Sequence, residues 1–399
     1  MLFNSQIHNF DKFILDWNPN KEYVLFGASK ECVQFIRSMD FLLGNDVLKI
    51  KYIVDHEVGD TKELEDVNQI SSYYHQSKTL ENKRGNIKLI HIDEYIDTGD
   101  SVIITTDEFR QYYKNYLDSK NIKYTWYKNI AAIWPLKLKN KTHIFQTDIM
   151  VTEICNLNCS YCNMFIPHYQ EPKHKELKNI LSDIDLYFKL VDYVSIFHLV
   201  GGEPFLHPNI ADIIKHILEN YNDKLDKLII TTNGTVLPKE NIINLLQTSN
   251  VILSVSNYSG KLTKLQNKVN RVLETYRTNN INHYVRNEIE WYDFGDLRIK
   301  NNMSEEQLIN HFDSCTAPFR GLNDGKFYYC HLNTSAVLTK QFPINENDFV
   351  RLDSISNEDL IKFDLGFIPL GYLTFCDNCN GCNTNIKIPV SYEHQGLRK

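Results

Sequence analysis

The chain has 399 residues, of which 42% are hydrophobic, enough to build the cores of two or three domains. Its net charge of −7 argues against a nucleic-acid partner, because phosphate binding depends on concentrated Lys and Arg. No apolar run approaches the roughly 20 residues of a membrane span, and the first residues do not resemble a signal peptide. We therefore expect a cytoplasmic protein without a membrane partner.

Residues 1–140 predict a Rossmann-like α/β domain. Apolar runs that suit strands alternate with helical spacing, which indicates a parallel sheet; they lie at 23–28, 48–55, 87–96 and 101–108. Gly27 follows the first run, and Asp55 ends the second, where folds of this kind often hold a ribose. The dinucleotide fingerprint has three glycines and this loop has one, so a docking domain without a nucleotide is an equal alternative.

Residues 145–300 repeat a strand–loop–helix pattern. Three predicted strands run into "GGEP" (Gly201–Pro204), "TTNGT" (Thr231–Thr235) and "SVSNYSG" (Ser254–Gly260). Repeated βα units build an open or closed parallel barrel, whose chemistry lies at the carboxyl ends of the strands. We therefore expect these three segments to meet at one end of a barrel.

Eight of the nine cysteines fall into two groups, which indicates metal or redox chemistry in a reducing compartment. The groups are Cys155, Cys159 and Cys162, and then Cys315, Cys330, Cys376, Cys379 and Cys382. A structural zinc site needs four ligands. Three thiolates on one loop therefore suit an iron–sulfur cube with one iron open to a substrate or cofactor.

The first group, C-x3-C-x2-C with Tyr161 before its last cysteine, resembles the signature of the radical S-adenosylmethionine (SAM) superfamily. The resemblance implies an α/β fold with a partial (β/α)6 TIM-like barrel over 145–300. It also implies a [4Fe–4S] cluster on Cys155, Cys159 and Cys162, with SAM on the open iron. Such enzymes generate a 5′-deoxyadenosyl radical that takes hydrogen from an unactivated C–H bond.

The resemblance also implies a set of SAM contacts along the strand ends. In this set the Glu203 carboxylate accepts from an ammonium group, and Ser254 and Ser256 share one face because strand side chains alternate. The full set is Tyr161, Gly201, Gly202, Glu203, Pro204, Thr232, Asn233, Ser254, Ser256 and Asn257.

Residues 305–399 resemble the small iron–sulfur domain called twitch in its short form and SPASM in its long form. The cysteine count favours one auxiliary [4Fe–4S] cluster, bound by four of Cys315, Cys330, Cys376, Cys379 and Cys382, and hence two clusters in all. The leftover cysteine is inert, part of an unusual cluster site, or a hydrogen-atom donor, with Cys382 as the candidate. A zinc ribbon is the alternative for this region.

The domain layout favours hydrogen abstraction from a sugar, polyol or nucleotide-linked sugar, giving oxidation or epimerisation. The alternatives are epimerisation or cross-linking of a ribosomal peptide, and a non-catalytic iron–sulfur binding protein. An electron donor such as flavodoxin or ferredoxin is the expected protein partner. The stretch that contains His168, Lys173, His174 and Lys175 is either solvated or a docking patch for that donor.

Overall fold

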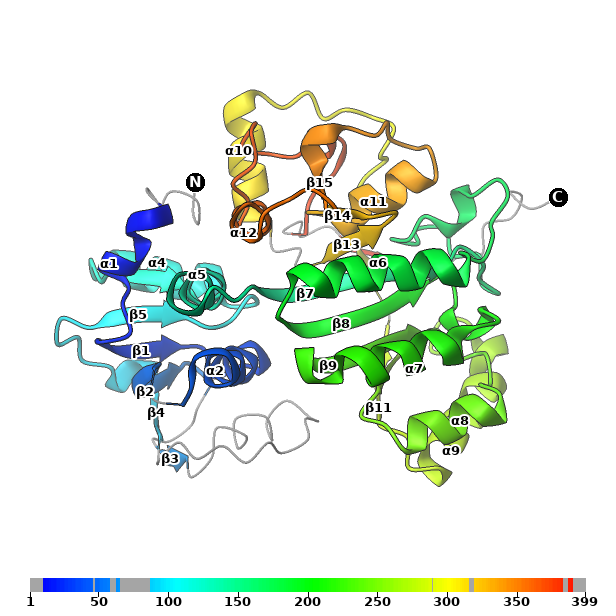
Figure 1. Ribbon diagram of the computed structural model, residues 1–399, viewed down its shortest axis with the longest axis horizontal. Coiled ribbons are helices and arrows are strands. Elements are labelled where there is room, and N and C mark those ends of the chain that lie inside the picture. Colours follow the sequence, from blue (N-terminus) through cyan, green and yellow to red (C-terminus); the bar gives the residue numbers. More distant parts are fainter. Residues whose placement is uncertain are drawn as a thin grey trace. The chain divides into compact units, whose positions relative to one another are not determined.

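The computed structural model describes residues 10–45, 47–57, 62–64, 87–288, 290–315, 319–382 and 387–389. The chain forms two compact units, residues 1–143 and residues 144–399 (Figure 1). No helix within these described ranges has the length and apolar character needed to cross a membrane.

The first unit is built on a six-stranded sheet with the order β3-β4-β2-β1-β5-β6. Five of its strands run parallel: β1 (Glu22–Phe26), β2 (Lys49–Asp55), β4 (Ile87–His91), β5 (Ser101–Ile104) and β6 (Tyr124–Trp126). The short β3 (Lys62–Leu64) pairs antiparallel with β4 at the edge. The four strands and the parallel sheet predicted for this region are therefore present.

Helices cover both faces of this sheet because its strands are buried apolar runs. Tyr113 and Leu117 of α4 (Arg110–Ser119) pack on one face, in a core with Phe26 of β1. The other helices of the unit are α1 (Phe13–Asp16), α2 (Lys30–Leu43) and α5 (Tyr127–Lys139). Ser29 caps α2 by accepting a hydrogen bond from the Cys32 amide, as expected for a serine at this position.

The second unit is built on an eight-stranded sheet with the order β11-β10-β9-β8-β7-β13-β14-β15. Its parallel core consists of β7 (His143–Thr152), β8 (Tyr193–Gly201), β9 (Leu225–Thr232), β10 (Ile252–Asn257) and β11 (His283–Asn287). The helices that follow these strands flank them (Figure 1); they are α6 (Leu177–Leu190), α7 (Ile210–Tyr221), α8 (Glu240–Gln247) and α9 (Gln266–Thr278). The predicted α/β class with a partial barrel is confirmed.

The C-terminal part extends the barrel sheet. The strand β13 (Arg320–Asn323) pairs parallel with β7, and it continues antiparallel into β14 (Lys326–Tyr328) and β15 (Phe349–Arg351). The helices of this part are α10 (Glu305–Ser314), α11 (His331–Leu338) and α12 (Asn357–Asp364). A two-stranded ribbon joins β12 (Glu290–Tyr292) to β16 (Lys387–Pro389). The predicted division of this unit between residues 300 and 305 stays a prediction.

Candidate functional site

The cysteine loop begins directly after β7 ends at Thr152, at the carboxyl end of the barrel. Cys159 is buried, and Cys155 and Cys162 are half-buried against an apolar cluster that includes Met150 and Val200. The backbone turns back at Phe165, whose φ of 53° is in the left-handed region. All three thiols therefore lie on one loop at one barrel end, as the sequence predicts.

Burial is the largest cause of the pKa shifts of Cys155 and Cys162. It raises the pKa of Cys155 to about 12, with a further contribution from the negative charge of Glu203. It also raises the pKa of Cys162, although hydrogen bonds from the amides of residues 164–166 oppose this change. The Cys155 sulfur accepts hydrogen bonds from the Leu157 amide and the Asn233 side chain, at 3.4 and 3.6 Å. Amide donors around sulfur suit thiolates that bind an iron–sulfur cluster.

The two glycines of GGEP are needed because two backbone segments touch there. The Gly202 amide donates to the Thr152 carbonyl at 2.7 Å, and the Glu203 amide donates to the Ile154 carbonyl at 2.8 Å. A Cβ on Gly201 would lie 2.6 Å from the Thr152 carbonyl oxygen, and one on Gly202 would overlap the Ile154 carbonyl. The glycines thus bring the backbone close to the cysteine loop.

Glu203 is fully buried, and its carboxylate already accepts three hydrogen bonds from the chain. The donors are the Thr232 hydroxyl at 2.8 Å, the Asn233 amide at 2.8 Å and the Phe205 amide at 3.2 Å. Burial raises the pKa of Glu203 to about 7, and these hydrogen bonds limit the rise. In this structure the carboxylate therefore holds the end of β9, and its contact with the SAM ammonium group stays a prediction.

Side chains of the TTNGT turn are tied to the cysteine loop. The Asn233 side-chain amide donates a hydrogen bond to the side-chain oxygen Oδ1 of Asn156 at 3.0 Å. Asn156 donates in turn to the Thr235 hydroxyl at 2.7 Å. Asn233 thus lies beside Cys155, as the predicted order of strand ends requires.

The predicted residues of β10 lie at the same barrel end. Ser254 and Ser256 are both buried, and the Ser256 hydroxyl accepts a hydrogen bond from the Arg286 guanidinium at 2.8 Å. Asn257 instead donates to the Asn287 side chain at 2.8 Å. Pro204 begins the short 3-10 helix Pro204–Leu206, which directly follows Glu203.

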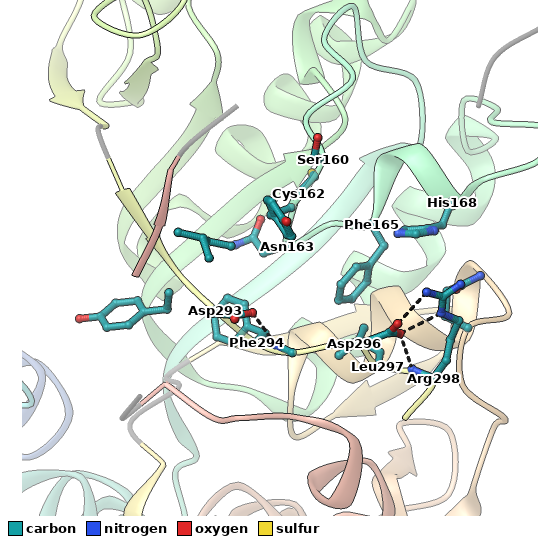
Figure 2. A pocket seen from close by; sticks show the side chains of 15 residues that line it. Ser160, Cys162, Asn163, Phe165, His168, Asp293, Phe294, Asp296, Leu297 and Arg298 are labelled. Atoms are coloured by element: carbon teal, nitrogen blue, oxygen red, sulfur yellow. Dashed lines mark hydrogen bonds and ion pairs between the residues drawn. The ribbon is translucent and has the colours of Figure 1, made fainter. Parts of the chain in front are cut away.

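A pocket of about 350 Å³ opens beside the cysteine loop (Figure 2). One side comes from the loop itself, with Tyr161, Cys162 and Phe165. The opposite side comes from residues 292–298, and Gln341 and Ile388 complete the lining. Tyr161 is the one predicted SAM contact that lines this pocket.

Residues 292–298 were not predicted to belong to the site. The Asp293 side chain accepts a hydrogen bond from the Gly295 amide at 2.9 Å, which forms a turn. Asp296 binds the Arg298 guanidinium through both oxygens, at 2.8 and 2.6 Å (Figure 2). The Asp-x-Gly spacing is a turn signal in the sequence, but nothing in it indicates that the turn faces the cysteine loop.

All five C-terminal cysteines line one second cavity, of about 30 Å³. Cys315 ends α10, Cys330 precedes α11, and the other three lie on the segment 376–382. Burial raises the pKa of Cys330 to about 12, with a contribution from Cys315. The fold therefore brings together cysteines that are far apart in the sequence.

The donor chemistry fits clusters better than a single ion. Among the residues that the structure describes, no group of three or more His, Cys, Asp or Glu side chains is arranged to hold one metal ion. A [4Fe–4S] cluster makes a different demand, because each cysteine binds a separate iron and the thiolates need not converge on one point. Sulfur-only donors at both places, with amides directed at the sulfur atoms, meet that demand.

Two further predicted features have partners within the chain. The Asp55 carboxylate accepts a hydrogen bond from the Ala28 amide at 2.6 Å, so in this structure it closes the Gly27 loop. Lys175 is half-buried, and its amino group donates to the Asn323 side chain, so it is not part of a solvated basic stretch. Lys173 remains exposed.

The cysteine loop thus follows the strand β7 at the carboxyl end of a partial parallel barrel and precedes the helix α6. Residues 149–287 match the model of the Radical SAM superfamily. The chain therefore carries a radical SAM domain over these residues. A domain of this kind implies a [4Fe–4S] cluster and SAM as cofactors.

Curated relatives are similar to parts of the chain. The GTP 3′,8-cyclase of Erythrobacter litoralis (strain HTCC2594) is 32% identical over 93 residues, which are 22% of this chain and 26% of that protein. This chain thus spans about a quarter of the length of that relative. The GTP 3′,8-cyclase of Clostridium acetobutylicum is 27% identical over 269 residues, which are 61% of this chain and 78% of that protein.

Solved structures are also similar to parts of the chain, at low sequence identity. Native anSMEcpe with bound AdoMet and Kp18Cys peptide is 14% identical, with a TM-score of 0.40 over 58% of this chain and 84% of that chain. BtrN in complex with AdoMet and 2-DOIA is 15% identical, with a TM-score of 0.38 over 62% of this chain and 96% of that chain.

Proposed function

We propose that the protein is a radical SAM enzyme that abstracts hydrogen from a C–H bond of a sugar or polyol. The outcome is oxidation of a carbinol or inversion of its configuration. The observation that carries this proposal is the pocket beside Cys162, which has both ring-shaped aromatic side chains and hydrogen-bonding groups in its lining. When bound at the cysteine loop, the cluster and SAM supply a 5′-deoxyadenosyl radical.

The pocket lining suits a hydroxylated ring. Tyr161, Phe165, Tyr292 and Phe294 provide aromatic surfaces, and Asn163, Asp293 and Gln341 provide hydrogen-bonding groups. Arg298 forms a bidentate ion pair with Asp296, which reduces the positive charge that the pocket offers to a phosphate. These contacts favour a sugar or polyol without phosphate over a nucleotide-linked sugar.

The C-terminal cysteines support an auxiliary [4Fe–4S] cluster in a twitch-like domain. Four of the five cysteines lining the second cavity suffice as ligands, and the fifth, with Cys382 as the candidate, is a hydrogen-atom donor in the epimerisation case. Oxidation removes one electron and one proton more than hydrogen abstraction, so it needs an electron acceptor such as this cluster. Flavodoxin or ferredoxin is the proposed external electron donor.

The test is a 5′-deoxyadenosine assay on anaerobically purified protein with dithionite and SAM. The wild-type chain should form 5′-deoxyadenosine, and Cys155→Ala should reduce it at least 100-fold, because the open-iron site then cannot assemble. The matched control is Cys32→Ala, a buried cysteine of the first unit. Equal amounts from Cys155→Ala and the wild type would overturn the assignment.

Substrate class is tested with deuterated compounds in the same assay. Deuterium transfer to 5′-deoxyadenosine from deuterated inositols or hexoses is the expected result. Transfer from UDP-glucose alone would contradict the pocket argument, and transfer from a deuterated peptide alone would replace the sugar proposal with peptide modification.

A further inference from the structure

The wall of the pocket that faces the cysteine loop has no regular secondary structure. This wall segment, residues 293–303, connects the end of β12 with the start of α10. The hydrogen bonds inside this loop are local turns, such as those of Asp293 with Gly295 and of Asp296 with Ile299, so its overall shape depends on contacts with other parts of the chain. Among the described residues, its hydrogen bonds with other segments go to the cysteine segment of residues 376–382.

Residues between the C-terminal cysteines make these contacts. The Asn380 amide donates to the Phe294 carbonyl at 3.0 Å, and its side chain donates to the Asp293 carbonyl at 3.2 Å. The Asn378 side chain donates to the Leu297 carbonyl at 2.8 Å. The two spacer residues therefore hold the part of the wall that lines the pocket.

Asp377 holds the far part of the wall segment. Its carbonyl accepts from the Asn301 amide at 2.7 Å, and its carboxylate accepts from the Met303 amide at 2.9 Å. A side chain at Gly295 would press on Asn380, with its Cβ 3.1 Å from the amide atoms, so the fit between the two segments is close. Downstream of the cysteines, β16 pairs with β12 and adds Ile388 to the pocket lining.

Binding of metal to Cys376 and Cys379 would fix the backbone of Asp377 and Asn378 between them and restrain Asn380 beside them. A metal-free segment of this kind keeps more conformational freedom, because metal binding and local folding are coupled. We infer that metal loading at the C-terminal cysteines shapes the pocket wall, with Asp377, Asn378 and Asn380 as positioning residues for substrate. This inference rests on the proposed function, since it takes the pocket as the substrate site and the cysteines as metal ligands.

The test is amide hydrogen exchange of the full chain, followed by mass spectrometry, with iron content measured on the same samples. Removal of the C-terminal metal by the double substitution Cys376→Ala and Cys379→Ala, which leaves three of the five cysteines, should make peptides from residues 293–303 exchange roughly tenfold faster. Asn378→Ala should give a similar acceleration with iron content unchanged, because it removes the wall contact and no ligand. Asn380→Ser is the second variant, should Asn378→Ala fold poorly.

The matched control is Asn244→Ala, which changes an exposed asparagine on α8 and should leave exchange of the wall unchanged. Unchanged exchange of the wall in the double variant Cys376→Ala and Cys379→Ala, with its C-terminal iron lost, would overturn the inference. So would unchanged exchange in both Asn378→Ala and Asn380→Ser with full iron content. Lack of 5′-deoxyadenosine in the wild type would sink the proposed function alone, because the exchange result does not depend on SAM cleavage.

Discussion

Glu203 is a residue whose type is readable from the sequence and whose surroundings are not. The sequence places it at the end of a strand, beside two glycines. It does not indicate that the Thr232 hydroxyl and the Asn233 amide donate hydrogen bonds to the Glu203 carboxylate. This arrangement depends on the neighbouring strand β9, which lies about 30 residues further along the chain. Long-range pairing of this kind is outside the reach of local patterns.

The pH dependence of stability should report this burial. The Glu203 pKa is raised from 4.5 to about 7 by burial, so the folded chain holds this proton more tightly than the unfolded chain. The contribution to stability is therefore full below pH 4.5 and is lost as the pH rises through 7. In metal-free protein, the free energy of unfolding of the wild type should fall between pH 5 and 8 by about 3 kcal/mol more than that of Glu203→Gln.

Urea denaturation at several pH values measures these slopes. The comparison uses the change of the unfolding free energy with pH, because the buried amide introduced by Glu203→Gln lowers the unfolding free energy by the same amount at every pH. Glu219→Gln, at an exposed position of α7, should keep the wild-type slope. Parallel curves for the wild type and Glu203→Gln would show that the carboxyl titrates normally.

At the scale of elements, one aspartate joins the barrel to the C-terminal hairpin. Asp183 of α6 is buried, and its two oxygens accept the amides of Asp324 and Gly325 at 2.9 and 2.6 Å. These amides form the turn between β13 and β14, where Gly325 has a φ of 67°. The helix α6 thus fixes the turn of the C-terminal hairpin.

Substitution of this aspartate should loosen the hairpin. Asp183→Asn replaces one acceptor oxygen by a donor, so one buried amide loses its partner, at a cost of about 1 to 3 kcal/mol in the free energy of unfolding. Asp185→Asn, two residues further on the same helix but exposed, should cost less than about 1 kcal/mol. Chemical denaturation of both variants measures the difference in the free energy of unfolding. Equal losses in the two variants would show that the hydrogen bonds of Asp183 do not hold the hairpin turn.

Elements were predictable where the pattern is local. The strands of the first unit, the helix capped by Ser29 and the three strand-end motifs follow from apolar runs and short signals. The pairing of β13 with β7 was not predictable in this way, because it joins Arg320 to Thr147 across the whole barrel. The pocket wall at 293–298 was missed because loops carry little periodic signal.

At the scale of the whole molecule, iron content tests the assignment of the two cysteine groups. The wild-type chain should bind about eight irons, as two [4Fe–4S] clusters. A variant in which Cys155, Cys159 and Cys162 are all substituted should keep about four irons. A double variant in which both Cys315 and Cys330 are substituted should also keep about four irons. Iron and sulfide analysis after anaerobic reconstitution makes the measurement; about four irons in the wild type would assign the C-terminal cysteines to zinc or to catalysis.

The pairing of β13 with β7 has a consequence for synthesis of the protein. The edge of β7 at Thr147 finds its partner only when Arg320 has been translated. At typical rates of synthesis this takes roughly 10 to 35 s, during which the strand offers unpaired amides and carbonyls to other chains. The nascent barrel is therefore expected to need protection by a chaperone until its last strands emerge from the ribosome.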